Sequence, residues 1–203
     1  SALARIPVRR ELAPPSSGGL ASPPAARMTP NARSGIDPES RAIVSAPMVS
    51  LTRYGVKIDG SSLDVGQWAY ETEVALLLEV MSHNTVGAAL LWGLSTHGLS
   101  VMITPYVHLV CNAGAGGLPT GAYVQFTPSI FSTSSPLGCN HANSAGADPG
   151  EILFHELVHA LRNTARKWRQ GSIGGIAPSY ENDEEFIALM LTNIYISERH
   201  RPL

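Results

Sequence analysis

The segment from His155 to His159 carries the residues whose types and spacing best suit a chemical role. It contains two histidines four positions apart, with Glu156 directly after the first. Four residues of an α-helix turn the chain through about 400°, so both imidazoles lie on one helical face, roughly 6 Å apart along the axis. Both rings can then reach one Zn²⁺ at about 2.0–2.1 Å. Glu156 is rotated by about 100° from His155, so it can act as a base on a water molecule at the metal without binding the metal itself.

The flanking residues predict the helix that this spacing requires. Asp148 suits the N-cap, Pro149 the first helical position and Glu151 the third. Arg162, Arg166 and Lys167 follow near the expected C-terminus, where the helix dipole favours positive charge. A chance match to so short a motif is the alternative, and these helix signals argue against it. The apolar positions that would bury one side of the helix are Ile152, Leu153, Phe154, Leu157, Val158 and Leu161.

A catalytic zinc site needs a third protein ligand, which usually comes from another element. The segment 180–190 predicts a second helix, capped by Asn182 or Asp183, with several acidic residues at its start. Favourable interaction with the helix dipole explains most of these acids. We expect Glu185 to bind the metal, because it directly precedes the apolar residues and should point inward. Glu184 is the second choice, since a shift of one residue turns a side chain by about 100°.

From Glu151 onward the chain resembles the NleD-like zinc metallopeptidase effectors, which bacteria inject into host cells. The matching segments are 152–161 and 182–185, and the order Glu-Phe-Ile-Ala from Glu185 is similar to the third-ligand helix of zincin metallopeptidases. The resemblance implies a zincin-like fold, Zn²⁺ and a protein substrate, with host signalling kinases as targets of some members. It also implies secretion and delivery into a target cell. Related zincins use a Tyr or His ahead of the ligand helix to stabilise the oxyanion, which would assign that role to Tyr180; the alternative for Tyr180 is an ordinary packing aromatic.

Composition divides the chain into a tail and one domain. Residues 1–40 are rich in Pro, Ser and Gly and contain no aromatic residue, so we expect a disordered tail that serves as a secretion address or a linker. Residues 41–203 are expected to form the metallopeptidase domain, acting as a monomer. The formal charge of −2 gives no sign of nucleic-acid binding. No apolar stretch approaches the length of a membrane span.

The remaining elements predict an α+β fold. We expect strands over 54–58, 99–104, 107–110 and 122–127, helices over 67–81 and 85–94, and a glycine-rich turn over 112–121. The glycines at 114–117 lack the Lys-Ser/Thr of a phosphate loop, so a hairpin or loop is expected there. The strand over 123–127 is either an edge strand that binds an extended substrate or an ordinary interior strand.

Cys111 and Cys139 are expected to be free thiols, because two cysteines in a chain of this length do not make a disulfide framework.

Taken together, the motif, the expected third ligand and the resemblance predict a zinc endopeptidase. One alternative keeps the chemistry and makes the domain the toxic part of a polymorphic antibacterial toxin. The other is a non-catalytic binding protein, in which a fourth ligand such as His141 closes a structural zinc site.

Overall fold

The computed structural model describes residues 51–96, 98–108, 110–139, 146–169, 171 and 182–201. These residues form a five-stranded sheet and four α-helices, which confirms the predicted α+β class. The predicted tail, residues 1–40, lies outside the described residues.

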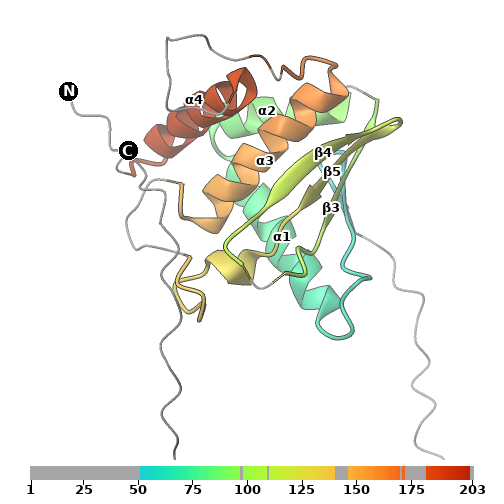
Figure 1. Ribbon diagram of the computed structural model, residues 1–203, viewed down its shortest axis with the longest axis vertical. Helices are drawn as coiled ribbons and strands as arrows, with labels where there is room; N and C mark the ends of the chain where they lie inside the picture. Colours follow the sequence, from blue (N-terminus) through green and yellow to red (C-terminus); the bar gives the residue numbers. More distant parts are fainter. Residues whose placement is uncertain are drawn as a thin grey trace, which may run out of the picture. The chain divides into compact units, whose positions relative to one another are not determined.

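The sheet is mixed, with the strand order β1-β2-β3-β5-β4 (Figure 1). A turn at Tyr54–Gly55 joins β1 to the antiparallel β2, and β2, β3 and β5 run parallel. The last strand, β4, pairs antiparallel with β5, so β4 is one edge of the sheet among the described residues. The strands are β1 (Leu51–Arg53), β2 (Val56–Ile58), β3 (Ser100–Thr104), β4 (Gly114–Leu118) and β5 (Gly121–Gln125).

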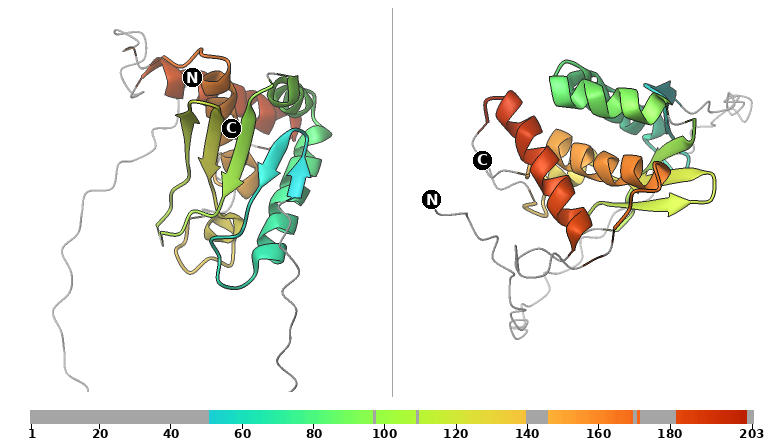
Figure 2. Two further views of the ribbon diagram at one scale, coloured as in Figure 1. Left: turned by 90° about the vertical axis from the view of Figure 1, so that its right-hand side faces the viewer. Right: turned by 90° about the horizontal axis from the view of Figure 1, so that it is seen from above.

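One face of the sheet packs into the hydrophobic core. Alternate side chains of a strand point to opposite faces, and here one face is apolar. On the opposite face Lys57, Met102 and Tyr123 are partly exposed. The left view of Figure 2 shows the helices gathered behind the sheet, and the apolar side chains of the sheet and the helices form one core. The inward residues, each at most 1% exposed, are Val56, Ile58, Val101, Ile103, Ala122 and Val124.

Helix α3 lies at the centre of the helical layer. It packs against α1, α2, α4, β4 and β5. The predicted helices are confirmed in place, with slightly later ends for the first two. The bounds are α1 (Gln67–Ser82), α2 (Thr85–Thr96), α3 (Pro149–Thr164) and α4 (Asp183–Glu198), with a short 3-10 helix, η2 (Pro128–Phe131).

None of the described helices is by itself long and apolar enough to cross a membrane. By length and composition alone, α1 and α2 pass as a pair, but the pair is bent by 116°. Both helices bury one side in the core, through Val74 and Leu78 of α1 and Leu91 and Leu94 of α2.

Two predictions were wrong: residues 107, 108 and 110 are not in a strand, and the segment 112–121 contains β4 rather than only a turn. Of the two alternatives for the strand over 123–127, the interior strand is confirmed, because residues 123–125 belong to β5. Glycine is a poor strand former in general. In β4 it permits close approach: a Cβ on Gly116 would lie 2.6 Å from the Tyr123 ring, and one on Gly117 would lie 2.9 Å from Oδ1 of Asn163 in α3. Gly117 therefore lets the edge strand lie directly against α3, and Gly116 leaves room for the Tyr123 ring of β5.

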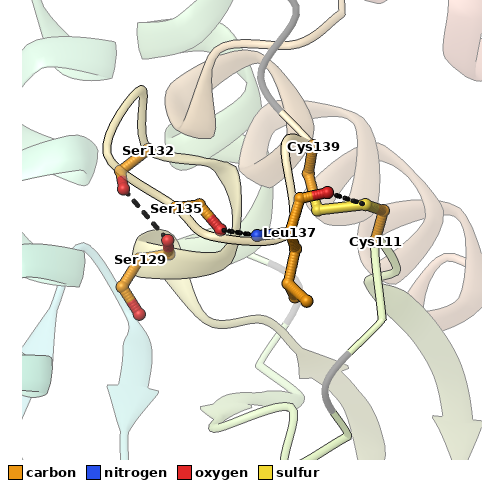
Figure 3. Close-up of a disulfide and its surroundings, with 6 residues drawn as sticks. All are labelled: Cys111, Ser129, Ser132, Ser135, Leu137 and Cys139. Carbon is orange, nitrogen blue, oxygen red and sulfur yellow. Dashed lines mark hydrogen bonds between the residues drawn. A yellow bond between two sulfur atoms is a disulfide. The ribbon is translucent and has the colours of Figure 1, made fainter. Parts of the chain in front are cut away.

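The prediction of free thiols was also wrong, because Cys111 and Cys139 form a disulfide with Cα atoms 5.3 Å apart (Figure 3). The register of the β4–β5 hairpin explains their proximity. Gly114 at the start of β4 pairs with Gln125 at the end of β5, so the segments before β4 and after β5 leave the hairpin at the same end. The disulfide joins those two segments, 28 residues apart in sequence.

Candidate metal centre

Helix α3 presents both predicted histidines as its sequence signals require. The Asp148 side chain accepts the Gly150 N–H at 2.9 Å and caps the helix, with Pro149 at its first position. His155 and His159 lie one turn apart, with ring centroids separated by 4.7 Å. Their Nε2 atoms are 3.0 Å apart, so both point toward one place.

Helix α4 adds the third group at the same place. Asn182 caps α4 by accepting the Glu185 N–H through Oδ1 at 3.0 Å. The two Glu185 carboxylate oxygens each lie 3.3 Å from a histidine Nε2, Oε2 from that of His155 and Oε1 from that of His159. Tetrahedral ligands at about 2.0–2.1 Å from an ion are about 3.3–3.4 Å apart, so each Glu185 oxygen lies at ligand spacing from one histidine nitrogen, while the two nitrogens are slightly closer together. His155, His159 and Glu185 therefore form a group that can hold a metal ion.

Glu184 lies on the other side of His159 and is not part of this group. Its side chain is fully buried and accepts the Arg162 Nε–H at 2.7 and 2.8 Å through its two oxygens. Its Oε1 also lies 3.4 Å from His159 Nδ1. Such a carboxylate fixes the orientation and the proton of the ring, leaving Nε2 available to a metal.

His155 has a comparable partner in Thr192. The Thr192 hydroxyl donates to the carbonyl oxygen of Ala188 at 2.8 Å, and its oxygen lies 3.5 Å from His155 Nδ1. Because the hydroxyl proton is engaged by Ala188, the oxygen is left to accept from Nδ1. This contact also favours a free Nε2 lone pair directed at the metal group.

The metal group opens into a cleft of about 450 Å³ that also contains Glu156. Glu156 is 9% exposed, and burial raises the pKa of its carboxyl group against the opposing charges of His155 and His159. The edge strand supplies the opposite wall of the cleft. The other lining residues are Asn112, Ala113, Gly114, Ala115, Trp168 and Leu189.

Electrostatics of the three converging groups favour a negative Glu185. Hydrogen bonds to His155 and His159 hold the pKa of Glu185 well below its ordinary value, in spite of partial burial. Burial disfavours the charged form of His159, but the hydrogen bond and the charge of Glu185 outweigh it, so the pKa of His159 is raised. A cation is therefore favoured where these groups meet.

Several contributors to the site were missed by sequence reasoning. Thr192 follows Glu185 by seven residues and Arg162 follows His159 by three, so helical spacing could have placed each on the same face as its neighbour. Trp168, whose ring lies 5.3 Å from that of His159, carried no comparable signal. Tyr180 and His141, predicted as an oxyanion donor and a closing ligand, lie outside the described residues.

No family model matches this chain, and neither a curated protein nor a solved structure matches it.

Proposed function

We propose that the protein is a zinc-dependent endopeptidase with a zincin-like catalytic domain. The observation that carries this proposal is the meeting of three ligand atoms with a buried glutamate in one open cleft. Two imidazoles and one carboxylate are a ligand set of catalytic zinc, which leaves one position for water. Among the described residues the group has three members and no fourth. The cleft at this group, with Glu156 in its wall, favours an enzyme over a structural site.

The roles follow from position. His155, His159 and Glu185 would hold the ion, which when bound supplies a Lewis acid that polarises a carbonyl group and makes a water molecule more acidic. Glu156 is placed to take a proton from water and to pass it to the leaving amine. Its raised pKa suits that task, because a general base works best when its pKa lies near the working pH.

The substrate of this proposal is an extended peptide lying along β4. Gly114 and Ala115 of this strand line the cleft, and β5 occupies only one side of β4. An extended peptide can add to such an edge through main-chain hydrogen bonds. The sequence suggested the strand that contains Tyr123 as the substrate-binding edge, but that strand, β5, is interior. We therefore assign the role to the neighbouring glycine-rich strand β4.

We also propose that the protein acts after secretion, as an effector delivered into a target cell. The disulfide supports export, because disulfides form in oxidising compartments and are rare in the cytosol. Host signalling kinases as substrates, and the alternative of an antibacterial toxin domain, remain predictions of the resemblance.

The test compares the wild-type protein with Glu156→Gln on a cell lysate, by mass spectrometry of newly formed protein N-termini. Glu156→Gln should keep bound zinc and lose about 10²- to 10⁴-fold of its activity, because only the base is removed. Glu185→Ala should instead lower the zinc content measured by elemental analysis. Full activity of Glu156→Gln rejects the mechanism, and unfolding on removal of zinc would indicate a structural site.

A further inference from the structure

A second cleft, of about 480 Å³, lies beside the metal cleft and is strongly basic. Trp168 lines both clefts, so the two clefts lie on either side of a shared residue. No carboxylate is among the described residues that line the second cleft, and four of them are cations. The lining consists of Arg162, Arg166, Lys167, Trp168, Arg169 and Ile187.

Three of these cations differ from every other cation in the described part of the chain. Five of its eight Lys and Arg side chains pair with a carboxylate of another described residue: Arg53, Lys57, Arg162, Arg199 and Arg201. The three that have no such partner among the described residues are Arg166, Lys167 and Arg169. All three are exposed, and they surround Trp168 in sequence. Within the described residues, these three charges are therefore exposed and not neutralised by a carboxylate.

The chain turns at Arg166, whose backbone is in the left-handed conformation that is more usual for glycine. Helix α3 ends in two bonds typical of a Schellman motif, from Arg166 N–H to the Asn163 carbonyl and from Lys167 N–H to the Arg162 carbonyl. The residue at the left-handed position is Arg166, with φ of 55°. Glycine is the usual residue there, because a Cβ makes this conformation unfavourable. An arginine at this position is therefore a local cost to folding.

We propose that this basic cleft binds an anionic side chain of the substrate, a carboxylate or a phosphate, close to the bond that is cleaved. The inference rests on the proposed peptidase function and names its substrate class. Helix α3 rises about 1.5 Å per residue, so Arg162, at the near end of the cleft, lies about 5 Å beyond His159 along the axis, and the helix ends about 8 Å beyond His159 at Thr164. An extended peptide advances about 3.4 Å per residue. The anionic residue is therefore within about three positions of the cleaved bond.

The activity test uses fluorogenic ten-residue peptide pools, random except for one position fixed as Asp, phosphoserine, Asn or Lys. Pools with an anion near the cleaved bond should be hydrolysed about tenfold faster than the matched Lys pools. This factor follows because each exposed ion pair with one cation should raise the rate about two- to fivefold. The triple variant Arg166→Gly, Lys167→Gln, Arg169→Gln should lose this preference and still cleave the Asn pools. The Asp and phosphoserine arms distinguish the two anions. The matched control, Arg53→Gln with Lys57→Gln, removes cations elsewhere and should keep the preference.

A binding test separates this inference from the peptidase proposal. Full-length Glu156→Gln protein is titrated against fluorescein-labelled hexa-aspartate and hexa-asparagine peptides, with anisotropy as the readout. Tighter binding of hexa-aspartate, lost in the triple variant and weakened by salt, supports the inference even if no pool is hydrolysed. Equal binding of the two peptides overturns it, and so does hydrolysis with no preference for anions.

The Tm of the triple variant shows whether it is folded, and the single variant Arg166→Gly tests the contribution of Arg166 alone. Glycine relieves the left-handed backbone, so the Tm should rise by about 2–4 °C while the preference for anions falls. A Tm that rises with an unchanged preference would remove Arg166 from the proposal.

Discussion

Glu184 offers the sharpest test of how the site is held together, because one fully buried carboxylate contacts three groups. It accepts from Arg162 Nε, from the Arg169 backbone N–H at 3.3 Å, and lies 3.4 Å from His159 Nδ1. In Glu184→Gln the shape of the side chain is kept, but one acceptor oxygen becomes a donor NH₂ group. That group has to face one of three donors, so one contact is lost.

Two magnitudes follow from these contacts. Removing one partner of a buried ion pair costs about 3–5 kcal/mol. The side chain of Arg162 is 18% exposed and also donates to the Lys167 carbonyl, so water can compensate in part, and we expect a loss of about 2–3 kcal/mol. Loss of a residue that orients a metal ligand lowers metal affinity about 10- to 100-fold. The 3.4 Å contact with His159 is long, so we expect about tenfold.

The assay is a competition for zinc between the protein and a chromogenic chelator, with Tm recorded alongside. Glu151→Gln is the matched control, because Glu151 is an equally buried carboxylate in the first turn of α3, with arginine partners of its own and no contact with the metal group. It should leave the zinc affinity unchanged. An unchanged affinity in Glu184→Gln would reject the orienting role. A loss as large as that of Glu185→Gln would mean that Glu184 is itself a ligand.

Three further predictions concern stability. In Gly121→Ala the new Cβ would lie 1.9 Å from a β3 carbonyl oxygen, so we expect a loss of about 3 kcal/mol or more in urea unfolding, whereas Gly114→Ala, with open space around it, should cost less than about 1 kcal/mol. Replacing both Cys111 and Cys139 by Ser removes a cross-link over 28 residues and should cost about 3–4 kcal/mol in the same measurement. Burial raises the pKa of Glu151 above its ordinary 4.5, so the folded protein holds this proton more tightly than the unfolded chain does. Stability should therefore fall as pH rises from about 4.5 through the raised pKa, and Tm scans of Glu151→Gln over the same range should not show that loss.

The helices of the site were predictable because their signals are local. A cap, a proline and an apolar periodicity lie within a few residues of one another, as at Asp148 and Pro149 or at Asn182, and tertiary contacts did not override them. The choice of Glu185 over Glu184 also follows from local geometry, since a rotation of about 100° decides which acid faces the Nε2 atoms of the two histidines.

The edge strand and the disulfide depend on residues far apart in the sequence. Gly116 and Gly117 belong to a strand that pairs with β5, and Tyr123 and Asn163 occupy the space that side chains at these two positions would need. Cys111 and Cys139 lie close together because, in the β4–β5 hairpin, the segment before β4 and the segment after β5 are at the same end. Neither relation leaves a short-range pattern, so the glycine content predicted a turn and the small number of cysteines predicted free thiols.

The cross-link between Cys111 and Cys139 bears on how the protein should be handled. Asn112 and Ala113, which form part of the cleft wall, follow Cys111 directly, so this wall is tied covalently to the segment beyond η2. A buffer with dithiothreitol opens that tether, and its thiolates compete with the histidines for zinc. Protein prepared under reducing conditions therefore lacks the cross-link that holds the cleft wall where we propose that substrate binds.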